Sequence, residues 1–591
     1  MNVSAIDWAI IAAFFVISLL IGLVTSKKAG SSAKEFFLSG RNMPWWLLGV
    51  SMVATTFSAD TPNLVTDIVR KNGVAGNWAW WAFLLTGMLT VFVYAKLWRR
   101  SEVTTDLEFY ELRYSGKGAA FLRGFRAIYL GVFFNVVIMA TVSLAAIKIG
   151  GVMLGLSPVQ TLLIASVVTV VYSSLGGLKG VLLTDFFQFF IAMIGSFGAA
   201  YFILDLPEIG SLTNLLTHAN VVDKLDFVPD FQDPNVYIPL FILPIAIQWW
   251  ATWYPGAEPG GGGYIAQRML SAKDERNAVG ATLFFNIAHY ALRPWPWILI
   301  ALSSLVIFPN ISDMQAAFPQ IPVDKLGDDL AYSAMLTYLP TGLIGIVLAS
   351  LIAAVMSTLS THLNWGSSYI VNDFYLRFVK PEASDKELVT IGRVSTVGLM
   401  VLSAVLALAL SSALDAFNIL LQIGAGTGLI FILRWFWWRI NAYTEISAMA
   451  ISFVVAIFFE VINPKVNWIL IPENQAYLKL VYSVSITTVG WLLVTFLTRP
   501  EKDEVLLSFY RKVYPASFGW KKVLDRYPEE KQSIGQLPKE IGLMLIGSIM
   551  VYAALFATGF WIYGEVLGGV IATLVALAGG AIIIKSWKNI R

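Results

Sequence analysis

The chain has 591 residues, of which 57% are hydrophobic and only 13% are charged. This composition excludes an ordinary soluble globular protein and indicates a polytopic membrane protein. The net charge of +3 is too small to indicate a nucleic-acid partner, and the lack of cysteine excludes disulfides and thiolate metal sites.

Apolar stretches recur along the chain, each long enough to cross a hydrocarbon core of roughly 30 Å. They predict fifteen membrane-spanning segments. In chain order these are residues 7–26, 45–69, 78–98, 120–150, 158–176, 180–203, 236–255, 276–307, 337–372, 388–411, 415–438, 443–462, 478–498, 540–563 and 566–586. The first is not expected to be a cleaved signal, because an acid, Asp7, precedes it in place of lysines.

Basic residues cluster in every second connection between the predicted spans. The positive-inside rule places these loops in the cytoplasm, and the loops 205–235 and 309–335, rich in Asp and Pro, on the opposite side. We therefore expect a multi-pass protein of the cell membrane (plasma or inner), with the N-terminus outside and the C-terminus cytoplasmic. The basic residues are Lys27, Lys28, Lys34, Arg41, Arg99, Arg100, Arg113, Lys117, Arg123, Arg268, Lys273, Arg276, Arg377, Lys380 and Lys386.

Two predicted spans are interrupted by helix-breaking residues. SADTP (58–62) places an acid and a proline at membrane depth, and YPGAEPGGGG (254–263) ends a tryptophan-rich segment. Each break begins a group of five spans, which predicts paired repeats and a transport site near the middle of the membrane. The predicted organisation is an extra helix and loop (1–44), a first five-helix repeat (45–203), an extracellular loop (204–235), a second repeat (236–440), and C-terminal helices (441–591) with a cytoplasmic insert (498–539).

The segment AAVMSTLSTHLN (353–364) carries an unusual number of hydroxyls for a membrane span. At 100° per residue, Ala354, Ser357, Thr358, Ser360 and Thr361 fall within an arc of about 160°. Helix packing and bonds to the preceding turn explain one or two such hydroxyls. Four exceed that need, and they suit a hard monovalent cation, which requires several oxygen ligands.

Acids inside spans are costly and mark functional sites by default. Asp185, in GGLKGVLLTDFFQFF, and Asp60 are two such acids. The alternative for Asp185 is a structural contact with Lys179 or the backbone. His362, beside the hydroxyls, is a proton-relay candidate, although packing or hydrogen bonding within the bundle is favoured.

Several segments resemble the signature segments of the sodium:solute symporter family. They are WWLLGVSMVATTFSAD, GGLKGVLLTDFFQ, YIAQRMLSAK and AAVMSTLSTHLNWGSSYIVNDFY, which occur in the family's order over roughly residues 7–440. The resemblance implies an all-α polytopic protein with the LeuT-type inverted five-plus-five helix repeat and extra flanking helices.

The resemblance also implies two sodium sites. The main site would use backbone oxygens of Ala54, Phe57 and Ala354 with the hydroxyls of Ser357 and Thr358. A second site, present in some members, would use Asp185, Ser357, Ser360 and Thr361. Two sodium ions would then be transported in each cycle.

The substrate is less well defined by the sequence. Where sugar-transporting members carry a glutamine after the acid of the first core helix, this chain has Thr61, and a glycine-rich stretch is inserted before Gln267. Gln422, by contrast, resembles in position a sugar-contacting glutamine of the glucose- and galactose-transporting members of the family. The candidate substrate residues are Asp60, Thr61, Asn63, Trp78, Trp249, Trp250, Trp253 and Gln422.

We predict sodium-coupled secondary active import of a small organic solute, sugar-like by preference. No Walker A, nucleophile-elbow or kinase motif is present, so an enzyme or an ATP-driven pump is not expected. Amino acid or organic acid substrates, proton coupling, a passive channel or facilitator, and a transport-like sensor remain open alternatives. A monomer is expected to suffice for function, and the sequence leaves the oligomeric state open.

Overall fold

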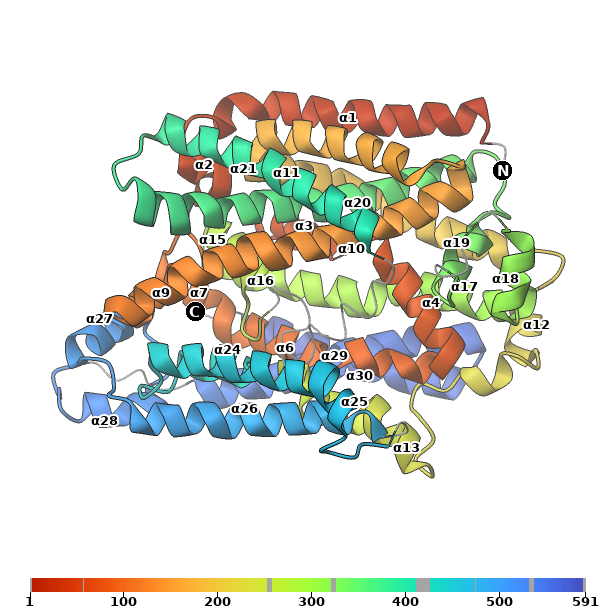
Figure 1. The fold of residues 1–591 in the computed structure, drawn as a ribbon. Coiled ribbons are helices and arrows are strands. Elements are labelled where there is room, and N and C mark those ends of the chain that lie inside the picture. Colours follow the sequence, from red (N-terminus) through yellow and green to blue (C-terminus); the bar gives the residue numbers. More distant parts are fainter. Residues whose placement is uncertain are drawn as a thin grey trace.

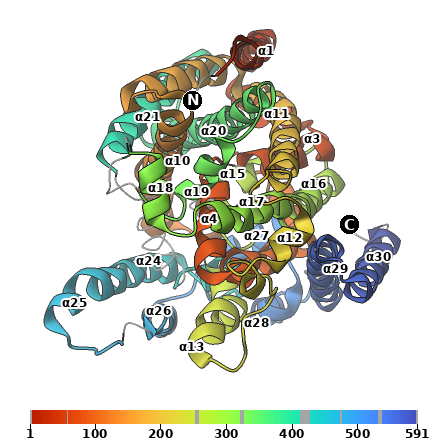
Figure 2. The same ribbon diagram turned by 90° about the vertical axis from the view of Figure 1, so that its right-hand side faces the viewer.

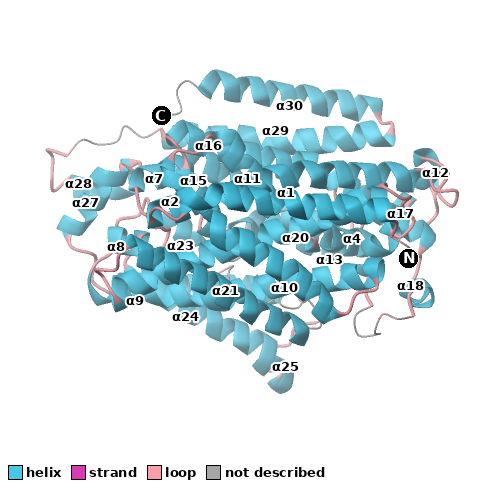
Figure 3. Ribbon diagram, turned by 90° about the horizontal axis from the view of Figure 1, so that it is seen from above, coloured by secondary structure: helices cyan, strands magenta, loops and turns pink. Residues whose placement is uncertain are grey.

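The computed structural model describes residues 3–56, 58–251, 258–319, 321, 326–410, 426–472, 475–530 and 536–587. These residues form helices and loops, with one isolated β-bridge between Met43 and Ala272. The long helices run side by side along a common axis, and the view from above shows the same helical bundle (Figures 1 and 3). The all-α prediction is therefore confirmed.

The first half of the chain builds one part of the bundle. Its helices are α1 (Ala5–Ala29), α2 (Ala33–Leu38), α3 (Trp45–Thr55), α4 (Asp60–Asn72), α5 (Trp78–Trp81), α6 (Leu84–Leu89), α7 (Ala95–Ser101), α8 (Phe109–Arg113), α9 (Gly116–Ile128), α10 (Asn135–Ile149) and α11 (Pro158–Leu204). Short π-helical segments join several of them, so that residues 74–101 and 116–154 each form one span.

The second half continues the bundle. Its helices are α12 (Leu212–Thr217), α13 (Pro234–Tyr237), α14 (Leu243–Ala246), α15 (Gly263–Ser271), α16 (Glu275–Ile287), α17 (Pro294–Ile307), α18 (Ile311–Ala317), α19 (Leu330–Leu336), α20 (Leu343–Ser368), α21 (Asp385–Ala409) and α23 (Gly428–Leu433). In Figure 1, α12, α18 and α19 gather at one end of the molecule and α2, α27 and α28 at the other.

The C-terminal region adds helices at the periphery. They are α24 (Ala442–Ile457), α25 (Asn463–Val466), α26 (Leu478–Leu497), α27 (Asp503–Val513), α28 (Lys521–Leu524), α29 (Leu537–Tyr563) and α30 (Val566–Trp587). The end-on view shows α24–α26 and the α29–α30 pair outside the central helices (Figure 2).

The predicted number of fifteen spans is not confirmed. Within the described residues, eleven helical segments are long and apolar enough to cross a membrane, and three further apolar helices are shorter. The shorter ones are Trp45–Thr55, Pro158–Val171 and Pro234–Ala246. Most of the predicted span 415–438 lies outside the described residues.

Both predicted helix breaks are present where the structure can be described. The first lies between the end of α3 at Thr55 and the start of α4 at Asp60. The second precedes α15, where Gly260 and Gly261 adopt φ values of 83° and 90°. A Cβ on Gly260 would lie 3.0 Å from the Tyr94 ring, and one on Gly261 would lie 2.5 Å from Cε of Met269. Glycine is therefore required here by both backbone conformation and close packing.

The long helix α11 changes direction at Gly177, which has φ 53° and ψ −159°. This break separates the two predicted spans 158–176 and 180–203. The segment after the break packs against α20 along an extensive interface, and α20 is buried from Ala353 through Ser368. The break thus lets one half of α11 enter the centre of the bundle.

We expect Gly177→Ala to destabilise the protein. A Cβ at residue 177 would lie 2.8 Å from the carbonyl oxygen of Phe36, and the positive φ is unfavourable for alanine. The expected loss is roughly 1–3 kcal/mol, measured as a lower melting temperature of the detergent-purified protein.

Gly398→Ala provides the matched control. Gly398 lies within helix α21, and a Cβ there would meet no atom within 4 Å. Its melting temperature should stay equal or rise slightly, because alanine favours helix by about 1 kcal/mol. Equal melting temperatures for both variants would show that the break at Gly177 carries no strain.

Candidate ion-binding site

The hydroxyl face of α20 meets the broken end of α3. The last carbonyls of a helix lack partners within that helix, so they need donors or a cation. Thr358 Oγ1 donates to the carbonyl of Thr55 at 2.8 Å and to that of Ala354 at 3.1 Å. The structure therefore brings Ala354 and Thr358 to the carbonyl end of α3, next to Ala54.

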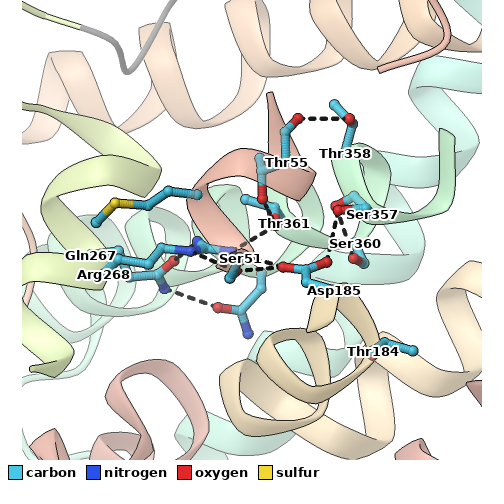
Figure 4. A network of polar contacts seen from close by, with 12 residues as sticks. Ser51, Thr55, Thr184, Asp185, Gln267, Arg268, Ser357, Thr358, Ser360 and Thr361 are labelled. Atoms are coloured by element: carbon cyan, nitrogen blue, oxygen red, sulfur yellow. Dashed lines mark hydrogen bonds and ion pairs between the residues drawn. The ribbon is translucent and has the colours of Figure 1, made fainter. Parts of the chain in front are cut away.

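Asp185, from the second part of α11, lies against the same face. Its carboxylate accepts hydrogen bonds from Ser51 on α3 at 2.5 Å and from Ser357 on α20 at 2.7 Å. Its side chain is completely buried. Two helices thus place hydroxyls around a carboxylate that a third helix carries (Figure 4).

Arg268, on α15, is the ion-pair partner of Asp185. Its Nη2 lies 3.7 Å from Asp185 Oδ2, and both side chains are fully buried. The same Nη2 donates to Thr361 Oγ1 at 2.7 Å and to Ser51 Oγ at 3.2 Å. The hydroxyl of Ser51 therefore bridges the two charges, since it accepts from the guanidinium and donates to the carboxylate.

This arrangement corrects two interpretations of the sequence. The positive-inside rule places Arg268 in a cytoplasmic loop, whereas the structure shows a buried residue of α15. The sequence offers Lys179 or the backbone as a structural partner of Asp185, whereas the ion pair of Asp185 found in the described residues is with Arg268. A buried carboxylate requires a nearby opposite charge, and α15 supplies it.

Gln267 fastens α15 to two other helices. Its Nε2 donates to Asn364 Oδ1 on α20 at 2.9 Å and to the carbonyl of Phe37 on α2 at 3.0 Å. Its Oε1 accepts from Arg268 Nη1 at 3.0 Å. The adjacent pair Gln267–Arg268 therefore connects α15 with α2, α3, α11 and α20. Figure 4 shows Arg268 beside Ser51, Thr361 and Asp185.

The remaining hydroxyls of α20 have different partners. Ser360 Oγ donates to the carbonyl of Ser357 at 3.0 Å, within its own helix. Thr361 Oγ1 lies 3.0 Å from Thr55 Oγ1 and also accepts from Arg268. All four hydroxyl-bearing residues of the face are fully buried.

The candidate substrate residues lie in three places. Asp60 and Asn63 begin α4, and Oδ1 of each is buried and accepts no hydrogen bond within the described residues. Thr61 Oγ1 is 3.5 Å from the carbonyl of Thr56. Trp78 donates to the carbonyl of Phe227 and is almost completely buried.

Trp249 and Trp250 form an edge-to-face pair with ring centroids 5.5 Å apart, after α14. Three predicted site residues, Phe57, Trp253 and Gln422, lie outside the described residues.

Sequence reasoning missed Ser51, Thr55 and Arg268 as parts of this network. The spacing of Ser51 and Thr55 provides a signal, because residues four apart lie on the same side of a helix. For His362 the sequence favours packing or hydrogen bonding within the bundle, and the structure shows its Nδ1 2.5 Å from Oδ1 of Asn135, with the side chain fully buried.

An all-helical bundle with discontinuous helices and a buried polar site at the breaks has the architecture of a secondary transporter. Residues 36–452 match the family model described as "Sodium:solute symporter family". The chain therefore belongs to the sodium:solute symporter family, and it is a multi-pass membrane protein that couples solute transport to sodium.

Curated relatives include several sodium-coupled transporters. The chain is 26% identical over 482 residues to a sodium/glucose cotransporter of Vibrio parahaemolyticus, covering 78% of this chain and 86% of that protein. It is 26% identical over 423 residues to a sodium/mannose cotransporter of Bos taurus, covering 68% of each. It is 25% identical over 551 residues to sodium/myo-inositol cotransporter 2 of Homo sapiens, covering 84% of this chain and 78% of that protein.

A solved structure has the same fold. A Na+-coupled sialic acid symporter in a substrate-bound outward-open state superposes with a TM-score of 0.66 at 19% identity, covering 85% of this chain and 100% of that one. The predicted LeuT-type fold class is confirmed.

We expect Asp185→Leu to destabilise the protein strongly, because it leaves the Arg268 guanidinium buried beside a leucine. Breaking a buried ion pair from one side costs about 3–5 kcal/mol. The double variant Asp185→Leu with Arg268→Leu should recover most of this loss, since no buried charge remains. Melting temperatures in detergent test this, and a double variant no more stable than the single one would contradict the pairing.

Proposed function

We propose that this protein imports a small polyhydroxylated solute, sugar-like in chemistry, together with two sodium ions. The observation that carries the proposal is the meeting of the α20 hydroxyl face with the carbonyl end of α3. Neutral oxygens from two helices can there replace the hydration shell of a monovalent cation. Relatives named for glucose, mannose and myo-inositol support the solute class.

In this proposal the first sodium ion is bound by carbonyls of Ala54, Phe57 and Ala354 and by the hydroxyls of Ser357 and Thr358. The hydroxyls of Ser357 and Thr358 are buried and already directed toward oxygens of α3 and α11. A second ion uses Asp185, Ser357, Ser360 and Thr361. The solute binds near the start of α4, where Asp60, Thr61 and Asn63 lie, with Trp78, Trp249, Trp250, Trp253 and Gln422 as further candidates.

The proposed orientation follows the charge bias of the loops. The N-terminus lies outside a plasma or inner membrane, and the C-terminus is cytoplasmic. Repeats comprising residues 45–203 and 236–440 rock about the ion site, while 441–591 flanks them. A sodium ion entering a negative interior gains about 2.3 kcal/mol for each 100 mV, which drives the import. A monomer contains all the residues invoked.

Uptake into proteoliposomes tests the coupling. The panel of labelled solutes comprises glucose, mannose, myo-inositol, sialic acid, proline and a dicarboxylic acid, at fixed pH. We expect at least one sugar or polyol to accumulate above its external concentration when an inward sodium gradient is present, and only to equilibrate without one. Equal accumulation without sodium would exclude symport with sodium, and equilibration under both conditions would indicate a facilitator.

The double substitution Ser357→Ala with Thr358→Ala tests the first sodium site. Because it removes two oxygen ligands, the apparent sodium affinity of transport should fall about tenfold or more, equivalent to at least ~1.4 kcal/mol. The sodium concentration giving half-maximal uptake measures this.

Ser367→Ala is the matched control for that measurement. Ser367 is a buried serine of the same helix whose hydroxyl donates to the carbonyl of Asn364 at 3.0 Å. Its sodium dependence should match that of the unmodified protein. A folded double variant with unchanged sodium dependence would reject the assigned ligands.

A further inference from the structure

The guanidinium of Arg268 lies on oxygens that the proposed second sodium ion would use. It donates to Thr361 Oγ1 at 2.7 Å and lies 3.7 Å from the carboxylate of Asp185. Both groups belong to the proposed ligand set of that ion. A sodium ion bound to the same two groups would therefore have to share them with a positive charge.

The charge balance makes such sharing unfavourable. Asp185 and Arg268 have no exposed side-chain surface, so their charges compensate each other in a medium of low dielectric. A sodium ion placed beside them would give two cations to one carboxylate, with little water to screen their repulsion. The remaining ligands, Ser357 and Ser360, are neutral and add no negative charge.

We propose that Arg268 and sodium alternate as the counter-charge of Asp185 during the transport cycle, so that Arg268 acts as a tethered substitute for the second ion. The inference rests on the proposed function, because it requires a second sodium site at Asp185. When sodium binds there, the guanidinium withdraws from Thr361 and Asp185. When sodium leaves, the guanidinium returns and the carboxylate is never left buried without a cation.

The position of Arg268 links this exchange to the movement of α15. The preceding residue, Gln267, bonds to Asn364 on α20 and to the carbonyl of Phe37 on α2. The end of α15 is tied to the segment before α3, since Met43 N donates to the carbonyl of Ser271 at 3.1 Å. Withdrawal of the guanidinium removes the contacts of α15 with Thr361 and Ser51. The affinity for sodium therefore depends on the position of α15, and the binding of sodium in turn changes the position that α15 prefers.

The simpler alternative is that Arg268 is a permanent structural partner of Asp185. In that case the guanidinium holds Asp185, Ser51 and Thr361 in place and does not compete with sodium. The two possibilities predict opposite effects of removing the guanidinium, because loss of a competitor raises sodium affinity, whereas loss of a structural partner disturbs the site and leaves sodium affinity equal or lower.

Equilibrium binding of ²²Na⁺ to the purified full-length protein distinguishes them without knowledge of the solute. In Arg268→Gln the competing cation is absent, and the sodium affinity of the second site should rise by about tenfold, within the range usual for coupled ligands. Sodium should also raise the melting temperature of Arg268→Gln more than that of the unmodified protein. Arg268→Lys keeps the charge and should bind sodium with an affinity closer to the unmodified value.

Ser51→Ala is a second variant that preserves every charge and is therefore expected to fold. It removes the hydroxyl to which Arg268 donates twice, at 3.2 and 3.3 Å, so sodium affinity should again rise, by a smaller factor. Arg100→Gln serves as the control. Arg100 forms an ion pair with Glu275, with Nη2 2.9 Å from Oε2, and neither residue belongs to the network around Asp185, so this variant should leave sodium binding unchanged.

The alternation would be overturned if the sodium affinity of Ser51→Ala stays the same or falls, and if the same holds for Arg268→Gln should that variant fold. Arg268 would then be a structural partner of Asp185. The proposed function is judged separately, on the unmodified protein. If the unmodified protein binds no ²²Na⁺ and accumulates none of the panel solutes with sodium, both proposals fail. If it does both and the variants show no rise in affinity, only the alternation fails.

Discussion

The burial of one carboxylate and one guanidinium at the centre of a membrane bundle is the constraint on which the site depends. Neither Asp185 nor Arg268 has access to water, so each must be compensated by the other and by hydroxyls placed within hydrogen-bond distance. Ser51 meets this need for both charges, and Ser357 meets it for the carboxylate. Four helices, α3, α11, α15 and α20, are thereby held in one relative position.

The second requirement is backbone oxygen that is free of regular helix bonding. Irregular backbone is tolerated at membrane depth only where protein or a polar site covers it. The interval between α3 and α4 is such a place, and Thr358 on α20 covers the carbonyl of Thr55 there. The break and the hydroxyl face therefore stabilise each other. Buried carbonyls without donors or cations would be costly, and so would buried hydroxyls without acceptors.

The architecture was accessible from the sequence because hydropathy and helix breakers report on local physics. Apolar length predicted a helical membrane bundle, although not its number of spans, and SADTP and the glycine-rich segment predicted the two breaks. Asp185 and the hydroxyls of α20 were accessible because polar groups are rare in such segments. The partner of Asp185 was not accessible, since Arg268 is 83 residues away in sequence and only the packing of α11 and α15 against the same two helices, α3 and α20, brings them together. The position of Arg268 between two predicted spans gives no sign that its side chain is buried.

The glycine-rich stretch before α15 has a structural explanation in the conformation and packing of its residues. Interpreted from the sequence as an insertion before Gln267, this stretch leaves the solute undecided. Yet Gly260 and Gly261 adopt backbone conformations that disfavour side chains, and their missing Cβ atoms leave room for Tyr94 and Met269. Backbone conformation and close packing therefore explain why these residues are glycine, without any role in solute selectivity. Selectivity among solutes must therefore come from the side chains that contact the solute.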